Sequence, residues 1–593
     1  MYKLILLSTI TLFPHLINSV SCNKRYAIKT EGCTIPDFEP FNSQVNQYLQ
    51  ENVNISICNE GRPALIGSDF DSIFLINNSI QFYDVVVMDD LICGYTSFWR
   101  IPPKFDGDVD KNFEYSSTIY FYPDTPRVVI EDEFIMVECF YKTKLIYTDF
   151  FAFVPVKSSY SIRGDNFNVL LMGFDGTSRL NFYRHWPNTK RVLDRLGAEE
   201  LFGYNKVADA SFANQMPLLA GVSMEELNQL CWGNYTSYFD DCSFIWDVFK
   251  TNGFVTAYAD DTFAHGLFHG GDWVGFRNEH KTDYLFDYFM AEAESKIGNK
   301  KFGYFYDCLG ARKTYKVFLN YVEKFLERMN RHKLKFFANF FETIMSHDSI
   351  FKPKISDPTI SDFFNSELMK KTLQDTILIV YSDHGARFGP FRSFSFQGLI
   401  EDMLPYISFY FPPSFKKRHK KFYENFKINR HRLTTPYNIH ETLLNLLHLN
   451  DNNIKSKHYS LFQEIPENRT CDDAKIPLEY CACGYKDRTI STFDSYKSAL
   501  LIVSTINKIT PRDKCEKLHL NKLLHSRIKI VGANLHYTVT LESLPNEGIF
   551  QGTVKLSKEG TKTMSFALVG QITRLNRYGE QKRSILQAAE KKA

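Results

Sequence analysis

Apolar residues in the middle of the chain follow two alternating patterns. Continuous apolar runs, which are typical of buried strands, occupy residues 167–174, 333–344 and 375–381. Apolar residues at helical spacing run from Tyr315 to Met329, and two more helix-like segments cover residues 361–373, capped by Ser361, and 439–449. Strands that alternate with helices in this way predict a doubly wound, mostly parallel α/β sheet.

The two flanks of this region have a different pattern. Residues 22–160 contain short apolar runs separated by turn residues, which predicts a mostly β N-terminal region. Residues 466–593 begin with a Cys-containing segment and continue with strand-like alternation at Tyr537, Val539 and Leu541. We therefore expect a β-rich region at 22–160, a large α/β domain at 161–465 and a small β or α+β appendage at 466–593.

Residues 1–21 have the pattern of a secretory signal peptide. Lys3 precedes an apolar run, and small residues at Ser19 and Ser21 mark the expected cleavage site. A buried N-terminal strand is the alternative. No later stretch has the ~18 uninterrupted apolar residues that a membrane helix needs. We expect a secreted, extracellular protein with no transmembrane segment.

Two further features agree with an oxidising compartment. The chain has 12 Cys, an even number that predicts disulfides, although the sequence leaves their pairing open. Cys481 and Cys483 are close enough to suggest zinc, but no second close pair follows at zinc-site spacing. Four glycosylation acceptor sequences begin at Asn54, Asn77, Asn234 and Asn468.

The charge balance narrows the classes of partner. The 593 residues include 70 Lys and Arg against 68 Asp and Glu, and the net charge is +2. Such a balance does not favour a nucleic acid as partner. The apolar content of 44% is enough for a large buried core.

Two acidic motifs carry the candidate chemistry, and each closes an apolar strand. Asp175-Gly176 follows the run at 167–174, and Asp383-His384-Gly385 follows the run at 375–381. In a parallel sheet such residues lie at the carboxyl ends of strands, where ligands bind. Two carboxylates and an imidazole in one crevice predict a divalent metal, with Zn, Mn, Mg and Ca all compatible.

A hydroxyl group lies between these motifs in the sequence. Ser211 begins the segment Ser211-Phe212-Ala213-Asn214, which a helix-like run follows. A hydroxyl at a helix N-terminus beside a metal is a candidate nucleophile, and helix N–H groups there can hold an anionic ester. A plain helix N-cap is the alternative, since Ser is a preferred cap.

The order of these motifs resembles the alkaline phosphatase superfamily in its sulfatase-like branch. The chain is most similar to an uncharacterised animal family known as domain of unknown function 229. The match rests on the segments VLLMGFDGTSRLNFYRHWPNT, GFVTAYADD, FFETIMSHDS, VYSDHGARFG, LTTPYNIHETL and RTCDDAKIPLEYCACG. It spans most of the chain that follows the leader, including the C-terminal appendage.

The resemblance implies a role for several residues. Asp175 matches the first metal-binding carboxylate, and Asp383 and His384 match the late metal ligands. Ser211 falls at the position of the nucleophile, where its hydroxyl is also expected to contact the metal, and Asn214 is then a candidate for binding the ester oxyanion. His347 resembles a histidine that contacts the substrate anion or the leaving group, and Asp348 is a weaker candidate for a second metal.

The chain also departs from the family patterns. Sulfatases that form formylglycine carry Cys at the nucleophile position, followed by x-Pro-Ser-Arg, whereas Ser211 is followed by Phe212-Ala213-Asn214. Sulfatases usually have two consecutive Asp after the first strand, but Asp175 precedes Gly176. Ala213 also stands where the nucleophile loop of the family has Pro. The Asp-x-x-x-His ligands of a two-metal phosphodiesterase are missing, so one metal is the simpler expectation.

Other acidic, imidazole and guanidinium groups have more ordinary interpretations. Asp260-Asp261 is expected in a solvated turn rather than at a metal. His265 and His269 would face one metal if they were helical, but the glycines around them favour a loop. Two arginines after the first motif, Arg179 and Arg184, are expected at the surface or in ion pairs.

Together these features predict a secreted, metal-dependent hydrolase or transferase of phosphate esters, or less favourably of sulfate esters, with Ser211 as nucleophile. The alternative is a catalytically inactive extracellular binding or scaffold protein on the same fold. A phosphoethanolamine-type transferase is a weaker third hypothesis, because such enzymes are commonly anchored by membrane helices. In the first hypothesis the partner is an anionic ester substrate.

Overall fold

The computed structural model describes residues 25–49, 53–157, 166–234, 236–271, 273–278, 282–449, 457–489, 493–511, 515–531, 534–559 and 563–576. The signal peptide expected at 1–21 lies outside the described residues, as does Cys22. Within the described ranges, no helix combines the length and the apolar character needed to cross a bilayer.

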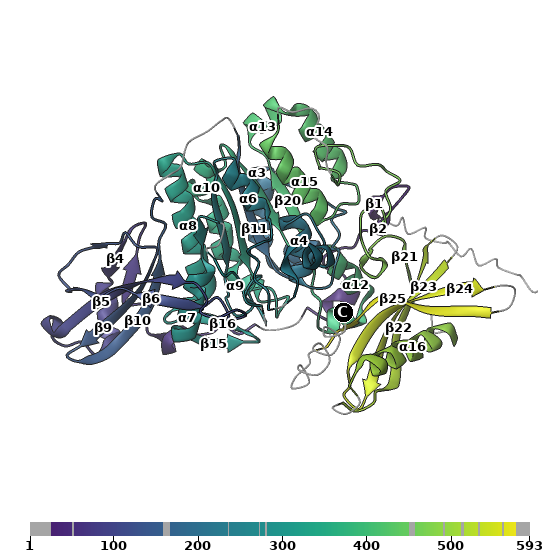
Figure 1. Ribbon diagram of the computed structural model, residues 1–593, viewed down its shortest axis with the longest axis horizontal. Coiled ribbons are helices and arrows are strands. Elements are labelled where there is room, and N and C mark those ends of the chain that lie inside the picture. The colour runs from purple at the N-terminus through teal and green to yellow at the C-terminus, as the bar shows by residue number, and fades with distance from the viewer. Residues whose placement is uncertain are drawn as a thin grey trace, which may run out of the picture.

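A seven-stranded, mostly parallel sheet forms the centre of the molecule (Figure 1). Five strands run parallel in the order β19 (Thr376–Tyr381), β11 (Asn168–Phe174), β18 (Phe336–Glu342), β13 (Val255–Asp260) and β14 (Tyr284–Leu285). Beside β19, the antiparallel β20 (Ile407–Tyr410) and then β12 (Glu199–Glu200) complete the order. The parallel strands are buried over their whole lengths, which explains their continuous apolar runs.

Helices cover both faces of this sheet. On one face α8 (Thr314–His332) packs on β18 and on α10 (Glu367–Thr372). Helix α10 contacts α9 (Pro353–Asn365), and α9 contacts α3 (Pro187–Leu196). On the other face α6 (Ile245–Thr251) packs on β13 and β18, and α15 (Pro436–Leu447) joins it to α4 (Ser211–Leu219). The predicted doubly wound α/β architecture is therefore confirmed, as are the helices expected near 315–329 and 439–449.

One predicted helix start is wrong. Ser361 lies inside α9, where its hydroxyl donates to the carbonyl of Pro358. The helix that follows is capped by Ser366, whose hydroxyl accepts from the backbone N–H of Met369. Ser366 has an extended backbone, which separates α9 from α10, so the expected single short helix is a pair.

The N-terminal region is rich in β-structure, as predicted. Its main sheet contains β10 (Lys144–Ala152), β9 (Phe134–Tyr141), β5 (Leu91–Ile101) and β6 (Asn112–Tyr115), and β7 (Ile119–Phe121) also pairs with β5. A smaller sheet joins β3 (Ile66–Ser68), β4 (Ser72–Leu75) and β8 (Val128–Val129). Residues 81–90 form one of the short apolar runs from which the β-structure of this region was predicted. They are not a strand, and belong to two 3₁₀ turns, Asn77–Tyr83 and Met88–Asp90, and the link between them.

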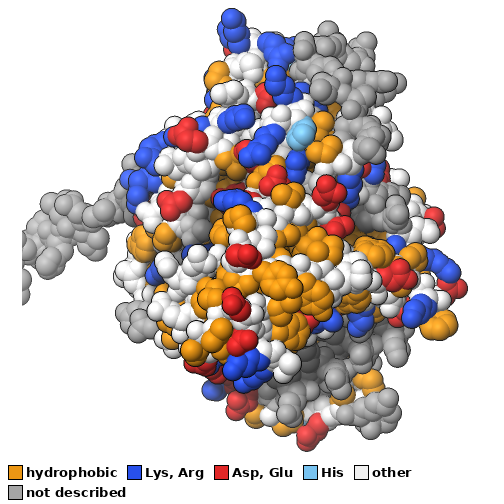
Figure 2. Space-filling view, turned by 90° about the vertical axis from the view of Figure 1, so that its left-hand side faces the viewer, with side chains coloured by type: hydrophobic (Ala, Val, Ile, Leu, Met, Phe, Trp, Pro, Cys, Tyr) orange, Lys and Arg blue, Asp and Glu red, His pale blue; other side chains and the backbone are white. Residues whose placement is uncertain are grey.

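This N-terminal region exposes a notable amount of apolar surface. Figure 2 looks onto this side of the molecule and shows hydrophobic side chains gathered near the middle of the face, with charged groups around them. Exposed apolar side chains of the region include Phe82, Val86, Trp99, Phe105, Tyr120 and Tyr122. Because apolar residues occur on both faces of its strands, a simple alternation of apolar and polar positions does not mark them in the sequence.

The C-terminal appendage is an α+β unit. Strands β21 (Tyr485–Thr489), β22 (His519–Val531), β23 (Asn534–Leu544), β24 (Ile549–Glu559) and β25 (Thr563–Arg574) form an antiparallel sheet in chain order. Helix α16 (Phe493–Ile509) packs on it, and the alternating residues Tyr537, Val539 and Leu541 are buried in their shared core. The unit lies beside the central domain in Figure 1.

The described residues form five disulfides, as the cysteine count predicted, and two of them connect different parts of the molecule. The five are Cys33–Cys483, Cys58–Cys308, Cys93–Cys139, Cys231–Cys242 and Cys471–Cys481. Cys481 and Cys483 lie in two different bridges, so their sulfurs are not a zinc site. Cys58–Cys308 joins the N-terminal region to β16 (Phe305–Leu309), and Cys33–Cys483 joins the link between β1 (Tyr26–Lys29) and β2 (Thr34–Pro36) to the start of the appendage.

Candidate metal and ester-binding site

Three predicted ligands meet at the carboxyl ends of the two central strands. Asp175 follows β11 directly, and Asp383 and His384 follow β19. The strands pair in parallel with Gly173 opposite Tyr381, so their ends lie at the same edge of the sheet. One ligand atom from each residue lies within 4.8 Å of the others, and all three side chains are buried.

Backbone groups fix the Asp383 carboxylate. Its Oδ1 accepts from the N–H of Gly176 at 3.1 Å and of His384 at 2.8 Å. Gly176 has a φ of +64°, a left-handed turn that favours glycine. The other oxygen, Oδ2, is buried and has no hydrogen-bond partner among the described residues. A buried carboxylate oxygen in this state is costly unless a cation compensates it, so the carboxylate fits a metal ligand.

The His384 imidazole is held in the orientation of a metal ligand. Its Nδ1 lies 2.8 Å from the carbonyl oxygen of Gly385, and because a carbonyl only accepts, Nδ1 carries the proton. Nε2 then presents its lone pair to the site, 3.7 Å from Asp175 and 3.4 Å from Asp383. Burial lowers the pKa of His384 to about 4, so the ring is neutral at neutral pH.

The close carboxylates also indicate a cation between them. Burial raises the pKa of Asp175 well above its usual value, and the nearby negative charge of Asp383 raises it further. Two buried carboxylates of this kind cannot both ionise readily unless a positive charge lies close to them. Hard oxygen donors and one imidazole suit Zn, Mn, Mg or Ca. The residues present therefore fit the divalent metal predicted from the sequence.

Ser211 lies beside this group at the start of α4. The N-cap of the helix is Ala210, and Ser211 is its first helical residue, so the alternative of Ser211 as a plain N-cap is wrong. The Ser211 hydroxyl instead lies 3.3 Å from Nε2 of His384 and 3.4 Å from Oδ1 of Asp175. This position leaves the hydroxyl next to two of the predicted metal ligands, Asp175 and His384.

Asn214 has partners other than those expected. Its amide oxygen accepts from the N–H groups of Val207 and Ala208, and its amide nitrogen donates to the carbonyls of Ala208 and Ala210. The side chain is buried by these contacts. We therefore propose that Asn214 acts by holding the loop that carries Ser211, in place of a direct contact with the ester.

His347 lines the same pocket as Ser211. Its Nδ1 lies 3.0 Å from Oδ1 of Asp348, whose other oxygen accepts from the N–H of Tyr304 at 2.9 Å. Tyr304 belongs to the turn between β15 (Gly298–Phe302) and β16. Asp348 belongs to no cluster of three or more potential metal ligands in the described part of the chain. It is placed to orient the His347 imidazole.

A pocket of about 200 Å³ opens above Ser211. Besides Asp175, Ser211 and His347, its wall includes the guanidinium of Arg387 and the apolar side chains of Phe212, Leu267, Trp273, Phe305 and Phe341. Sequence reasoning did not single out Arg387 or Trp273. Arg387 could have been identified from the sequence, since this residue lies four positions after Asp383 in the same motif. Trp273 gives no such signal.

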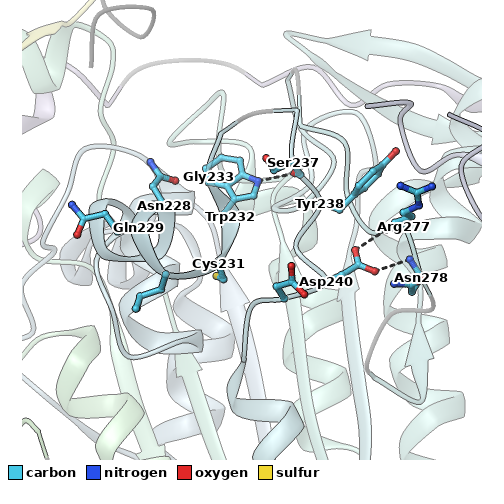
Figure 3. Close-up of a pocket in the computed structure, with 12 residues that line it drawn as sticks. Asn228, Gln229, Cys231, Trp232, Gly233, Ser237, Tyr238, Asp240, Arg277 and Asn278 are labelled. Carbon is cyan, nitrogen blue, oxygen red and sulfur yellow. Dashed lines mark hydrogen bonds between the residues drawn. The ribbon is translucent and has the colours of Figure 1, made fainter. Parts of the chain in front are cut away.

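A larger hollow of about 550 Å³ lies elsewhere on the central domain (Figure 3). It is lined by polar groups, and the Asp240 carboxylate accepts from the backbone N–H groups of Arg277 and Asn278. Trp232 in its wall packs 5.7 Å from Trp273, so one aromatic cluster separates the two cavities. Its lining includes neither Ser211 nor the predicted metal ligands, and size alone does not identify the functional site.

The acidic pair at 260–261 is not in a solvated turn, contrary to expectation. Asp260 ends β13, and both side chains are buried. The Asp260 carboxylate accepts from Leu267 N–H at 2.7 Å, and Asp261 accepts from Thr343 N–H at 2.9 Å. Both carboxylates therefore hold the loops that form the pocket.

His265 and His269 lie in a turn-rich loop, as the glycines predicted, and only His265 lines the pocket. His269 is buried elsewhere, 3.7 Å from Asp110 and 3.5 Å from Asp287. Burial alone would lower the pKa of His269, but the two carboxylates outweigh it and raise that pKa to about 9. Asp110 also pairs with Arg100 at 2.7 Å, so this second cluster is a closed ion-pair network.

The two arginines near the first motif form ion pairs, as expected. Arg179 pairs with Asp37 at 2.9 Å, and Arg184 pairs with Glu401. The Arg184 pair is almost fully buried, and Glu401 also accepts from the Ser178 hydroxyl. The contacts of Glu401 fasten the helix after β11 to the segment after β19, and the Arg179 pair fastens the same helix to the N-terminal segment.

Comparisons with known proteins agree with the predicted relationship. The model of the family described as "Protein of unknown function (DUF229)" matches residues 54–524. No curated protein matches. Among solved structures the chain is similar to a protein in the alkaline phosphatase superfamily from Vibrio parahaemolyticus, with 13% identity, 73% of this chain and 88% of that chain covered and a TM-score of 0.33. It is also similar to the lipoteichoic acid synthase LtaP from Listeria monocytogenes, with 11% identity, coverage of 72% and 90% and a TM-score of 0.33. Because the family model spans well over half of the sequence, the chain belongs to the DUF229 family.

Proposed function

We propose that this protein is a secreted, metal-dependent hydrolase or transferase of phosphate esters, with Ser211 as its nucleophile. The observation that carries the proposal is the place of the Ser211 hydroxyl. It lies 3.3 Å from His384 and 3.4 Å from Asp175, at the first residue of a helix whose cap is another residue. A hydroxyl in that position is free to react, beside groups that suit a metal.

Asp175, Asp383 and His384 would hold the metal. When bound, a divalent cation there would lower the pKa of a neighbouring hydroxyl and offset the negative charge of the ester. The protein contributes the rest by positioning. Gly176 and His384 donate hydrogen bonds to Asp383, and His384 donates one to the Gly385 carbonyl. These bonds fix the two metal-binding side chains before a metal or a substrate binds.

The proposed reaction proceeds through a phosphoserine. The Ser211 oxygen forms a bond to phosphorus, the bond from phosphorus to the leaving alcohol breaks, and the Ser211 proton passes to a basic group of the site or to solvent. Water or an acceptor alcohol then attacks the phosphoserine and restores the free hydroxyl. Because Ser211 is the first residue of α4, an ester attacked by its hydroxyl would lie near the first N–H groups of this helix, which favour an anion.

His347 is the proposed proton donor to the leaving alcohol. Asp348 holds its Nδ1, so the Nε2 side of the ring is directed to the pocket that both Ser211 and His347 line. A histidine suits this step because its ordinary pKa lies near neutral pH.

Phosphate is preferred over sulfate because the nucleophile is an ordinary hydroxyl. Formylglycine-type sulfatases need Cys and the x-Pro-Ser-Arg sequence at this position, and Ser211-Phe212-Ala213-Asn214 offers neither. The five disulfides suit an oxidising compartment, and Asn54, Asn77, Asn234 and Asn468 are all exposed, which supports the proposed secretion.

Replacing Ser211 with alanine tests the proposal. The Ser211→Ala protein should lose turnover of an aryl phosphate by about a thousandfold or more and should no longer be labelled by substrate phosphate, while its metal content stays the same. Ser366→Ala is the control, because Ser366 also lies at a helix N-terminus, as the cap of α10, but is outside the pocket. Unchanged turnover in Ser211→Ala would refute the nucleophile.

The alternative is a binding or scaffold protein that keeps the fold without catalysis. Ala213 favours it, since the nucleophile loop lacks the proline of the related pattern. Elemental analysis separates the two hypotheses. A glycosylated wild-type protein that holds no metal after incubation with Zn, Mn, Mg and Ca would support the binding protein.

A further inference from the structure

The pocket above Ser211 is lined by both polar and apolar side chains. Ser211, Asp175 and Arg387 belong to its polar group, and Phe212, Leu267, Trp273 and Phe305 belong to its apolar group. The volume of about 200 Å³ is below the roughly 300–1,000 Å³ of pockets for drug-sized ligands, so the ligand is small.

Arg387 differs from the other polar residues that line the pocket. Among the described residues that line this pocket, it is the only Lys or Arg. Its nearest ion-pair partner is Asp209 at 3.4 Å, a long contact to a partly exposed carboxylate. Its Nε is buried and has no hydrogen-bond partner in the described part of the chain. A buried guanidinium nitrogen without a partner is costly, and the side chain that carries it lines the pocket beside Ser211.

The charges around Arg387 favour an anion from outside the chain. Burial would lower the pKa of Arg387, but Asp209, Asp175 and Asp383 outweigh it and keep the side chain charged. A divalent cation on Asp175 and Asp383 would offset these two carboxylates. Arg387 would then add positive charge beside Ser211, and its planar fork matches two oxygens of a phosphate.

Trp273 is an apolar lining residue that packs against other aromatic side chains. Its ring packs 4.2 Å from that of Phe212, the residue next to Ser211, and 5.7 Å from Trp232 behind it. Phe212 and Trp232 are buried, whereas Trp273 is half-buried and lines the pocket. A half-buried indole fixed by aromatic neighbours presents a rigid flat face to a ligand.

From these observations we infer the substrate class: a small phosphate monoester whose phosphate is bound by Arg387 and whose alcohol carries a ring that packs on Trp273. The inference rests on the proposed function, because it assigns the substrate of the same site. The shared chemistry is a ring with an apolar face, which an aryl group and a sugar both possess.

Binding of inorganic orthophosphate tests the role of Arg387 without turnover. Titration calorimetry on the metal-loaded full chain should show about 10- to 100-fold weaker binding in Arg387→Gln, because a charge-assisted contact is lost. Metal content should match the wild type. Arg331→Gln is the matched control, since Arg331 is an exposed residue of α8. Equal orthophosphate affinity in Arg387→Gln, or no binding by the metal-loaded wild type, would overturn the inference.

Binding of three esters tests the role of Trp273. In the Ser211→Ala protein, phenyl phosphate or glucose 6-phosphate should bind tighter than glycerol 3-phosphate, and Trp273→Ala should reduce that preference about two- to tenfold. Trp99→Ala, an exposed tryptophan of β5, is the control. A preference for only one ring ester identifies the source as aryl or sugar. Equal binding of all three esters would overturn the ring assignment.

The two proposals fail in different ways. If Ser211→Ala retains full turnover, the proposed nucleophile is wrong, but the orthophosphate titrations still decide the role of Arg387. If Ser211→Ala is inert and Arg387→Gln binds orthophosphate normally, the proposed function stands and the substrate assignment falls.

Discussion

Two buried clusters in this molecule are built from the same residue types, two aspartates and one histidine. At the edge of the central sheet, His384 lies near Asp175 and Asp383, and in a second cluster outside the lining of the pocket His269 lies between Asp110 and Asp287. Burial lowers the pKa of His384 to about 4, whereas the carboxylates raise that of His269 to about 9. The same composition therefore gives a neutral ligand in one place and an imidazolium in the other.

The difference comes from what holds the imidazole. The carbonyl of Gly385 accepts a hydrogen bond from Nδ1–H of His384. The lone pair on Nε2 of His384 therefore faces two carboxylates that are close to each other. His269 has a carboxylate near each ring nitrogen, and a ring that is protonated at both nitrogens places a positive charge between the two carboxylates. The first cluster suits a bound cation, whereas the protonated histidine is itself the cation of the second. A list of residue types does not distinguish them.

The largest expected effect is on metal binding. The double variant Asp383→Ala/His384→Ala should lose the bound metal and, with it, turnover, because two of three ligands are gone. His269→Gln should keep the metal, since that cluster provides its own charge balance. Elemental analysis of the purified proteins measures both. Metal retained in the double variant, or lost in His269→Gln, would reverse the assignment of the two clusters.

The next effect is on stability. His269→Gln should lower the free energy of unfolding by about 3–5 kcal/mol, because Asp110 and Asp287 stay buried without their imidazolium. Urea denaturation measures this, and the matched variant Asp110→Asn/His269→Gln should recover part of the loss. A loss below about 1 kcal/mol would mean that the cluster is not an ion-pair network.

The pH dependence of that loss is a separate test. The folded pKa of His269, about 9, is above the ordinary value near 6.5, so its stabilisation is fully present below pH ~6.5 and is lost as pH rises through 9. The gap in unfolding free energy between wild type and His269→Gln should shrink by about 3 kcal/mol from pH 6 to pH 10. Urea denaturation across this range measures the gap. A gap constant with pH would contradict the assignment. The groups that face His269 or its partners are Asp110, Asp287, Asp260, Arg100 and Tyr288.

The smallest effect concerns a third Asp–His pair, His347 and Asp348. Asp348→Asn should lower kcat about tenfold, because the imidazole loses the charge that orients it. The loss should be larger for an alkyl phosphate than for a 4-nitrophenyl phosphate, whose leaving group needs no proton. Steady-state kinetics with both esters measure it. An equal loss for the two esters would point to a purely structural role.

The strand-end motifs could be predicted because buried parallel strands are continuous apolar runs, and here each run is followed by a polar motif. Asp175 after 167–174 and Asp383-His384 after 375–381 are examples, and parallel pairing brings them together. The helix at Tyr315–Met329 could be predicted because its charges and apolar residues alternate at helical spacing. Local pattern and tertiary packing agree at these positions.

Other features depend on contacts that no local pattern encodes. Asp260 and Asp261 look like turn residues, but the fold buries them because distant N–H groups of Leu267 and Thr343 need acceptors. Asn214 looks like a polar active-site residue, although its amide is used by the loop at 207–210. Trp273 joins the pocket through a loop with no periodic pattern. Ser361 and Ser366 are both good caps, and only the backbone decides between them.

The Cys33–Cys483 bridge spans 450 positions in the sequence. Asp175, Ser211, His347 and Asp383 all lie within the covalent circle that it closes. A protease that cuts one exposed loop inside this circle would therefore leave two fragments joined by the bridge. Such a nicked protein would migrate as one species on a non-reducing gel and separate into two only after reduction, so an intact-looking preparation is not proof of an unbroken chain.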